Sequence, residues 1–574
     1  MTSRNAQITG GVEVPAGFWQ REKSHYPKPL TPLGSSLLLT GINQAFPKVF
    51  AEFGLLLETL EFREIGGYVY QRVKPFGVSG SGSRPLPPKA AVWLMLRLHP
   101  SFRRRTARCK EAMRSGLDRT LIDRWYQEWR PQLTAGIGRW RSVDLTSLSG
   151  EELPAHLGEL REWTFDAIDV HFFLSAAGLS LVRLAFFCRE HLGYDDRQML
   201  GLLSGLSEAS SEAALDLARL ADEARADGRL TEAILAAADI EVPALLAERH
   251  PELARKFDEY LYRYGCRALR YELVEECLSE RPELVAELLQ DELRRPTDVK
   301  TEQERLAVAR AQAKAAALTA LEDETLRTEF LALLPEAERA YPVREDNEFY
   351  TVSVPLALVR FAALEAGKRL AKSGVLAAAD DLFFLRYDEA IAALRDRGAD
   401  YKEMVARRRE DFAAAEAFDP PASYGQEPPV PPLDVLPPEA RFAMEGVTYF
   451  MERVFEPERS NRREEAGVRE LRGIAASKGT FTGPARIILG EEQFDRLRPG
   501  DVLVCPITSP VWSILFAKVG ALVTDSGGVL SHPAIIAREF GVPAVVATGN
   551  ATQIIVDGQQ VVVHREAGVV QLLD

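Results

Sequence analysis

The chain has 574 residues, of which 46% are hydrophobic and 27% charged, and its formal net charge is −14. This composition is typical of a folded protein with several domains, and it excludes a disordered, collagen-like or disulfide-scaffold protein. The acidic balance argues against a nucleic-acid-binding or membrane-surface-binding protein. The five cysteines are scattered without a Cys-x-x-Cys pair. That spacing indicates a reducing compartment and predicts no zinc or other metal site.

Residues 1–90 are predicted to be rich in loops. Prolines crowd the segment 24–36, and residues 77–89 are rich in Gly, Ser and Pro. Proline restricts the backbone, so these segments are expected to be extended or turning. The N-terminus lacks the apolar stretch of a signal peptide, and the most apolar run, Val170–Cys188, contains polar residues. We therefore expect a cytoplasmic protein without a membrane span.

Residues 91–417 follow a helical pattern. Apolar residues recur there at three- and four-residue spacing, for example over 217–238 and 350–374. The next segment, 418–438, holds 8 of the 34 prolines, which is typical of a semi-rigid linker. A short connecting helix is expected after it, so that 418–470 forms a connecting segment.

Beyond residue 470, short β-rich runs are separated by Gly, Asp and Pro. The expected strands lie at 479–489, 501–506, 521–525, 543–548, 553–558, 561–564 and 569–573, and the expected helices at 509–519 and 532–540. This pattern predicts a compact α/β domain over 471–574. The predicted fold class is therefore multidomain, with a mainly α-helical N-terminal region and a C-terminal α/β domain.

One histidine lies in a setting that favours an anion. The strand expected at 521–525 leads into two glycines, and Ser531-His532-Pro533 then opens a helix. Serine is a good N-cap and proline is favoured in the first turn, so His532 is expected at a helix N-terminus. Free N–H groups and the helix dipole attract anions there, and they would cradle a phosphoryl group on a nucleophilic imidazole. The alternative is a histidine that only caps or packs.

The longer string Gly-Gly-Val-Leu-Ser-His-Pro-Ala-Ile-Ile-Ala-Arg-Glu-Phe-Gly-Val-Pro-Ala-Val-Val (527–546) resembles the phosphohistidine swivelling domain of the PEP-utilising family. This family includes PEP synthase, pyruvate phosphate dikinase, rifampin phosphotransferase and phenylphosphate synthase. Residues 500–525 and 548–563 resemble the rest of the domain. The resemblance implies that 471–574 is the swivelling domain and that His532 carries the phosphoryl group. It also implies phosphate-binding residues in the loop before His532, namely Asp525, Gly527, Gly528 and Ser531, together with Thr508. Arg538, six residues after His532, is a further candidate for binding the phosphate, and the alternative is a pair with Glu539.

The helical region is similar to the acceptor domain of rifampin phosphotransferase and to the large subunit of phenylphosphate synthase. The matching pieces are HYPKPLTPL (25–33), RYGCR (263–267), REDNEFY (344–350) and DDLFFLRYDE (380–389). The resemblance implies an acceptor domain over 91–417, with 1–90 as its N-terminal part.

Four residues of these matching pieces are candidates for the acceptor chemistry. Arg267 and Arg344 are candidate catalytic residues because an arginine fork matches a phosphoryl group. Glu345 is a third because a carboxylate takes a hydroxyl proton, and His25 is a candidate substrate-binding residue. The alternatives are helix–helix salt bridges for the first three and a packed loop residue for His25.

Family members take the phosphoryl group either from an ATP-grasp module or from a TIM barrel that uses PEP. We expect neither in this chain, because no run of βα units appears before residue 415 and no barrel follows the swivelling domain. A separate ATP-grasp partner is therefore expected to bind ATP and Mg²⁺ and to phosphorylate His532. The predicted function is transfer to a small-molecule hydroxyl, including a phenolic one, or to a carboxylate. The alternatives are a partnerless relative with non-phosphorylating acid–base chemistry in a biosynthetic pathway, and a degenerate binding scaffold.

Overall fold

A computed structural model describes residues 7–9, 12–77, 88–176, 178–268, 271–294, 299–396, 398–429, 432–455, 469–477, 479–508, 512, 515–516, 518–564 and 568–573. The chain forms two compact units. Unit 1 comprises Met1–Leu179, Tyr271–Glu275 and Asn347–Thr448, and unit 2 comprises Ser180–Arg270, Glu276–Asp346 and Tyr449–Asp574. These units cut across the four expected parts, because the C-terminal α/β domain shares unit 2 with helices from the middle of the chain.

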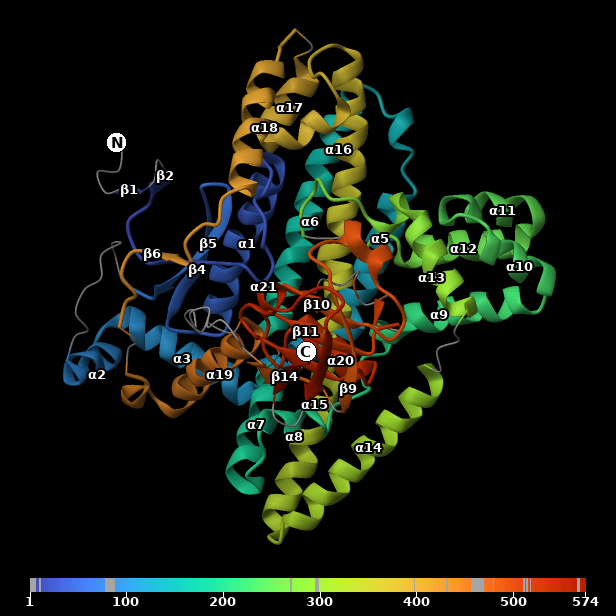
Figure 1. Ribbon diagram of the computed structural model, residues 1–574. Helices are drawn as coiled ribbons and strands as arrows, with labels where there is room; N and C mark the ends of the chain where they lie inside the picture. The colour runs from blue at the N-terminus through green and yellow to red at the C-terminus, as the bar shows by residue number, and fades with distance from the viewer. Residues whose placement is uncertain are drawn as a thin grey trace. The chain divides into compact units, whose positions relative to one another are not determined.

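Unit 1 combines a helical core with a small antiparallel sheet of strand order β4-β5-β3-β6 (Figure 1). Its strands are β1 (Gln7–Thr9), β2 (Val12–Val14), β3 (Trp19–Arg21), β4 (Leu57–Ile65), β5 (Tyr68–Pro75) and β6 (Ser423–Tyr424), of which β1 and β2 form a separate pair. Its helices are α1 (Pro32–Glu52), α2 (Lys89–Leu98), α3 (Pro100–Ser115), α4 (Leu117–Arg124), α5 (Arg130–Arg141), α6 (Glu152–Ala176), α16 (Val354–Lys372), α17 (Tyr387–Arg395) and α18 (Lys402–Glu416). Helix α19 (Pro438–Phe455) begins in unit 1 and ends in unit 2.

The prediction that residues 1–90 are rich in loops is wrong for most of the described part. Helix α1 has 21 residues, and it is followed directly by the β4–β5 hairpin. Pro32 lies in the first turn of α1, where its missing N–H costs nothing, and the Thr31 hydroxyl accepts the N–H of Gly34. The prolines therefore start the helix. Most of the predicted loop 77–89 lies outside the described residues.

The expected linker 418–438 is partly built into unit 1. Residues Ser423–Tyr424 form β6, which pairs with β3, and the Tyr70 hydroxyl donates to the Pro421 carbonyl at 2.7 Å. An edge strand tolerates nearby prolines because the N–H groups on its outer side are not needed to pair with another strand. The later part of the connecting segment, 456–468, lies outside the described residues.

The helices of unit 2 come from the middle of the chain. They are α7 (Leu179–Leu192), α8 (Asp196–Leu200), α9 (Glu208–Arg225), α10 (Gly228–Ala236), α11 (Val242–Arg249), α12 (Pro251–Tyr264), α13 (Pro282–Arg294), α14 (Val299–Ala320) and α15 (Glu324–Glu348). The helix predicted over 217–238 is in fact two helices, α9 and α10. Asp227 separates them, because its carboxylate accepts the N–H groups of Arg229 and Leu230 and starts α10.

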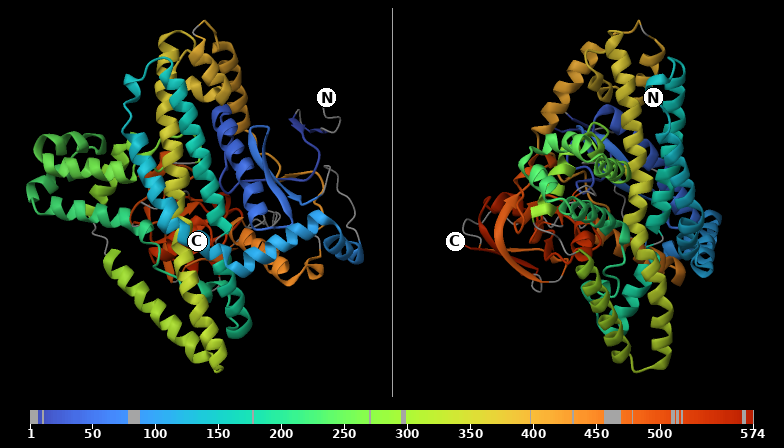
Figure 2. Two further views of the ribbon diagram at one scale, coloured as in Figure 1. Left: turned by 180° about the vertical axis from the view of Figure 1, so that it is seen from behind. Right: turned by 90° about the vertical axis from the view of Figure 1, so that its right-hand side faces the viewer.

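The C-terminal α/β domain is built on an eight-stranded sheet of order β7-β14-β13-β9-β10-β11-β12-β8 (Figures 1 and 2). Its elements are β7 (Glu470–Arg472), β8 (Ile474–Ala475), β9 (Thr480–Ile487), β10 (Val502–Cys505), β11 (Ala521–Thr524), α20 (His532–Glu539), β12 (Ala544–Val546), α21 (Ala551–Ile554), β13 (Gln560–His564) and β14 (Val569–Leu572). Strands β9 to β12 are parallel, and β10 and β11 are buried along their whole length. The predicted fold class is thus confirmed.

Six of the seven strands expected beyond residue 470 are present. The exception is 553–558, where α21 ends and a turn follows. The Asp525 carboxylate accepts the Thr552 N–H at 3.0 Å and so stabilises this short helix in place of a strand. Of the expected helices, 532–540 is confirmed as α20, and 509–519 lies mostly outside the described residues.

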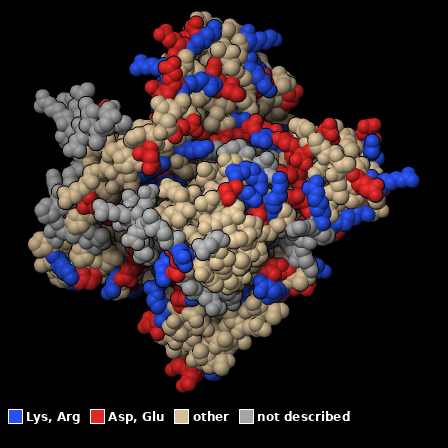
Figure 3. Space-filling view, viewed as in Figure 1, with Lys and Arg blue, Asp and Glu red and all other residues tan. Residues whose placement is uncertain are grey.

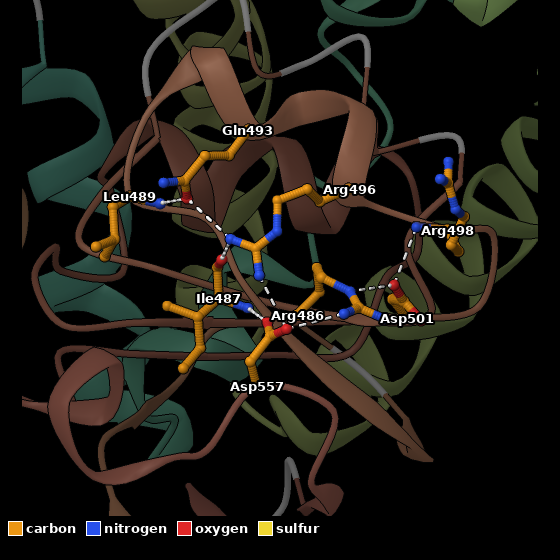
Figure 4. Close-up of polar contacts among 8 residues, drawn as sticks. All are labelled: Arg486, Ile487, Leu489, Gln493, Arg496, Arg498, Asp501 and Asp557. Carbon is orange, nitrogen blue, oxygen red and sulfur yellow. Dashed lines mark hydrogen bonds and ion pairs between the residues drawn. The ribbon is translucent and has the colours of Figure 1, made fainter.

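An ion-pair network ties β9 to the strands and turns beside it (Figure 4). Arg486 contacts Asp557 at 2.9 Å and Asp501 at 3.1 Å, and Arg496 also reaches Asp557 at 2.9 Å. Burial opposes the ionisation of Asp557, but the Ile487 N–H and the two arginines outweigh it and lower the pKa of this carboxyl. The network stabilises the α/β domain itself.

Charge is distributed without a single basic face in the view of Figure 3, where Lys and Arg intermingle with Asp and Glu. Two helical segments, Glu152–Leu192 and Glu324–Lys372, have the length and composition of membrane spans. Their most apolar windows are 47% and 67% buried, and core helices of soluble proteins pass the same test, so this is weak evidence for a span. The first segment contains the apolar run Val170–Cys188.

Candidate active site

His532 is the first residue of α20, as the sequence predicts. Ser531 occupies the N-cap position with an extended backbone, and Pro533 lies in the first turn. The Ser531 hydroxyl, however, donates to the Gly528 carbonyl at 2.6 Å and accepts no helix N–H. The serine therefore stabilises the preceding loop and leaves the first N–H groups of α20 without a side-chain cap.

The imidazole of His532 contacts a carboxylate from α15. Nδ1 of His532 lies 2.8 Å from Oε2 of Glu345, and the two side chains are 15% and 13% exposed. The other ring nitrogen, Nε2, is buried and has no hydrogen-bond partner among the described residues. A carboxylate at Nδ1 favours the tautomer with its proton there, which leaves a lone pair on Nε2.

The carboxylate of Glu345 is ionised. Burial alone would raise its pKa, but His532 and the guanidinium groups of Arg344 and Arg538 oppose burial and lower the pKa below its ordinary value. Arg344 also stacks on the ring of Phe450, with its guanidinium carbon 4.9 Å from the ring centre. The predicted residues Arg344, Glu345 and His532 thus lie in one half-buried electrostatic environment.

The opposite end of α20 carries Arg538 and Glu539. Arg538 is buried, with Nη1 donating to the Ala476 carbonyl at 3.1 Å, whereas Nε and Nη2 make no hydrogen bond within the part of the chain that the structure describes. Glu539 accepts the N–H groups of Gly205 at 3.1 Å and Ser207 at 3.2 Å. Burial raises the pKa of Glu539 to about 7 against these hydrogen bonds.

Tyr341 is a residue of this site that the sequence analysis missed. Its buried hydroxyl lies 3.4 Å from Oε1 of Glu539. Tyr341 precedes Glu345 by one helical turn on α15, so both side chains share one face of that helix. The spacing Tyr-x-x-x-Glu was a usable signal once Glu345 had been singled out.

The loop before His532 needs both of its glycines. Gly527 has φ +108°, a backbone conformation that favours glycine. A Cβ on Gly528 would lie 2.1 Å from the carbonyl oxygen of Arg453. The same carbonyl accepts the N–H of Leu530 at 3.0 Å, so the end of α19 lies directly against this loop.

For three other predicted residues, Asp525, Thr508 and Arg267, the contacts given below do not involve His532. Asp525 binds α21 through Thr552, and the buried Thr508 hydroxyl has no partner within the described ranges. Arg267 is 9% exposed, with its guanidinium 5.2 Å from the ring centre of Tyr264. No group of three or more His, Cys, Asp or Glu side chains suited to a metal ion occurs among the described residues.

His25 belongs to unit 1, whereas His532 belongs to unit 2. Nδ1 of His25 lies 3.1 Å from the buried Glu22 carboxylate, which also accepts the backbone N–H of His25. The imidazole side chain is 40% exposed and packs 5.8 Å from the ring centre of Tyr271. Among the described residues, a histidine also pairs with a carboxylate in unit 2 at His250 and Asp227, 3.2 Å apart, so this kind of pair is not special to His532.

Comparisons with known families match two parts of the chain. Residues 497–568 match the PEP-utilising enzyme mobile domain, and residues 171–345 match the rifampicin phosphotransferase fourth domain. The C-terminal domain is a PEP-utilising enzyme mobile domain. His532 is in this mobile domain, and Glu345 is the last residue of the fourth-domain match.

Relatives extend these matches over more of the chain. An uncharacterized phosphotransferase, YvkC, of Bacillus subtilis (strain 168) is 32% identical over 54% of this chain and 35% of the relative. A rifampicin phosphotransferase of a Streptomyces species is 32% identical over 55% of this chain and 34% of the relative. Chondramide synthase cmdD of Chondromyces crocatus is 28% identical over 97% of this chain and 14% of the relative. The chain spans about a third of the length of the first two relatives.

Proposed function

We propose that this chain is the carrier and acceptor part of a phosphotransferase, with His532 as the phosphoryl carrier. One observation carries the proposal: the contact between Nδ1 of His532 and Glu345 leaves Nε2 as a buried nitrogen at a helix N-terminus, without a hydrogen-bond partner among the residues that the structure describes. The matches to the mobile domain and to the rifampicin phosphotransferase fourth domain support it.

In the first half-reaction, the lone pair on Nε2 of His532 attacks the donor phosphorus. A P–N bond forms while the P–O bond of the donor breaks, and its electron pair leaves on the donor's oxygen. Glu345 would hold the proton on Nδ1 and stabilise the positive charge that develops on the ring. The first N–H groups of α20 would face the transferred phosphoryl group.

In the second half-reaction, an acceptor oxygen attacks the phosphorus and the electron pair of the P–N bond returns to Nε2. The proposed acceptor is a small-molecule hydroxyl, including a phenolic one, or a carboxylate. A hydroxyl proton would go to the free oxygen of Glu345, and Arg344 and Arg267 would balance the phosphoryl charge. His25 is the proposed substrate-binding residue of unit 1. Asp525, Gly527, Gly528, Ser531, Arg538 and Thr508 are the proposed surroundings of the phosphate.

The proposed donor is ATP, bound with Mg²⁺ on a separate ATP-grasp partner in the cytoplasm. The mobile domain would leave α15 to be phosphorylated and return to deliver the group. Phosphoryl transfer depends mainly on positioning and charge neutralisation, which a carrier that visits two sites supplies. PEP is the less favoured donor.

A second candidate function is supported by one comparison. The chain aligns over 97% of its length with a segment of chondramide synthase cmdD, a protein named for synthesis and not for phosphoryl transfer. A relative of this kind would use the His532–Glu345 pair for non-phosphorylating acid–base or hydroxyl-activation chemistry in a biosynthetic pathway. A degenerate binding scaffold is the third candidate.

The test is phosphorylation of the purified chain with γ-labelled ATP, β-labelled ATP and labelled PEP. Each donor is used alone and with lysate of the source organism, and His532→Ala is the matched control. We expect acid-labile, base-stable label on His532 only with lysate. Label from ATP without lysate would place the donor site in this chain. No label under any condition, with folded protein and active lysate, would favour the acid–base candidate or the binding scaffold.

A further inference from the structure

The last turn of α19 lies on the loop that leads to His532. The Arg453 carbonyl oxygen accepts the N–H of Leu530 at 3.0 Å, and only a glycine at 528 leaves room for it. This carbonyl belongs to the C-terminal end of a helix, which carries a partial negative charge. The loop Gly527–Leu530 therefore faces a negative group and uses one of its N–H donors on it.

A side-chain clamp holds this end of α19. Nε of Arg453 donates to Asp196 at 2.8 Å, and the Tyr449 hydroxyl donates to the other oxygen of the same carboxylate. The guanidinium of Arg453 stacks on the ring of Tyr449, 3.5 Å from its centre. Asp196 lies in α8, so the clamp joins the helices of unit 2 to the loop of the mobile domain.

This arrangement opposes a phosphoryl group on His532. Such a group carries about two negative charges near neutral pH and needs N–H donors. Leu530 is two residues before His532, and its N–H is already bonded to Arg453. The C-terminal end of α19 would also repel the phosphoryl group. The contact of Arg453 with the loop and the phosphorylation of His532 therefore disfavour each other.

We propose that the segment Tyr449–Arg453 is a strap that closes on the loop of unphosphorylated His532 and withdraws when His532 is phosphorylated. Asp196 stabilises the closed position of the strap through its hydrogen bonds with Tyr449 and Arg453. The proposal rests on the proposed function in one respect, that His532 carries the phosphoryl group. Because coupling between two states is reciprocal, loosening the strap must make His532 easier to phosphorylate.

The experiment uses potassium phosphoramidate, a small phosphoryl donor for imidazoles that needs no partner protein. The rate of acid-labile phosphorylation of His532 is followed by mass spectrometry of the peptide that contains it, because the chain has 8 histidines, in the full chain and in Asp196→Asn. We expect Asp196→Asn to react about fivefold faster or more, the lower end of ordinary coupling between sites. Asp222→Asn, which breaks only the exposed Asp222–Arg225 pair in the same unit, should react like the unmodified chain.

A second variant and a second readout guard against misfolding. Tyr449→Phe removes only the hydroxyl that reaches Asp196 and should raise the rate by a smaller factor. Amide hydrogen exchange at Leu530 should become faster in Asp196→Asn and, in the unmodified chain, after phosphorylation. Equal phosphorylation rates and unchanged exchange at Leu530 would overturn the strap but leave the proposed function standing. A chain whose His532 stays unphosphorylated in every variant would overturn both.

Discussion

Oε2 of Glu345 and Nδ1 of His532 lie 2.8 Å apart, although 187 residues separate them in the sequence. One residue comes from the helical part that matches a rifampicin phosphotransferase domain, and the other from the mobile domain. The contact joins the two at Nδ1, the nitrogen that the proposed phosphorylation does not use. The carboxylate can therefore orient the ring without blocking Nε2.

The first prediction concerns Glu345→Gln. Without the carboxylate, the ring loses its fixed tautomer and the charge that stabilises the reacting imidazole, so phosphorylation of His532 by phosphoramidate should slow about tenfold or more. Mass spectrometry of the peptide that contains His532, after timed reaction, measures this rate. The exposed Glu329 on α15 supplies the control variant, Glu329→Gln, and a normal rate in Glu345→Gln would remove Glu345 from the proposed mechanism.

The second prediction concerns the conformation of the glycine loop. At Gly527, φ is +108° and a Cβ would lie 2.8 Å from the Ser531 hydroxyl oxygen, so Gly527→Ala should destabilise the chain by about 1–3 kcal/mol. Thermal unfolding measures the change. Gly158→Ala, at an open position within α6, should instead be neutral or slightly stabilising. Equal midpoints for the two variants would show that the loop is unstrained.

The third prediction concerns the buried Lys518, which lies 2.9 Å from Asp291 and 3.3 Å from Glu287. Lys518→Met would remove the cation beside Glu287 and leave Asp291 with only its ion pair to Arg294 at 3.2 Å, and it should cost up to about 3 kcal/mol. The loss should be greater at pH 8 than at pH 5, because carboxyls can bind protons at the lower pH.

Thermal unfolding at both pH values tests this prediction. The control is Lys256→Met, which breaks an exposed pair with Glu223 and should change stability by less than about 1 kcal/mol. A loss in Lys518→Met that is the same at pH 5 and pH 8 would contradict the electrostatic explanation.

The fourth prediction follows from Glu272 in unit 1. Burial raises the pKa of Glu272 to about 7, although the Thr31 hydroxyl and N–H both donate to its carboxylate. The folded chain therefore binds a proton that the unfolded chain releases at lower pH. The resulting stability is fully present below the pKa of the unfolded state and is lost as the pH rises through about 7.

Glu272→Gln tests this explanation because its amide can still pair with Thr31. The unmodified chain should lose on the order of 1–3 kcal/mol between pH 5 and pH 8, and the variant should lose less. Denaturant unfolding at the two pH values compares them. If the free energy of unfolding fell equally in both proteins between pH 5 and pH 8, the pH dependence would come from other groups.

The mobile domain could be predicted from sequence because its local patterns agree with its tertiary structure. Its buried parallel strands appear in the sequence as short apolar runs. Ser-His-Pro predicts a helix start, and α20 begins there in the structure. The prediction of a strand at 553–558 was wrong because the carboxylate of Asp525, distant in the sequence, stabilises a helical turn there. Nothing near residue 553 in the sequence signals that contact.

The helical part was harder to predict. Periodicity indicates which residues are helical, but it does not indicate that Glu345 reaches His532 or that Asp196 binds Arg453. Arg344 and Glu345 were found only through a family resemblance, and Tyr341 and Asp196 were missed. The first 90 residues were misjudged because prolines that start a helix look like prolines that prevent one.

Helix α20 is held at both ends, by Glu345 on His532 and by the Gly205 and Ser207 amides on Glu539. Eight residues of helix separate these anchors by roughly 10 Å. Two fixed points leave a rigid body free only to rotate about the line that joins them, and a third point off that line stops the rotation. Lys518, in a different segment of the mobile domain, supplies the third. While these three contacts are in place, the imidazole meets α15 in a single orientation, so the direction of Nε2 is a property of the whole domain and not of the histidine rotamer alone.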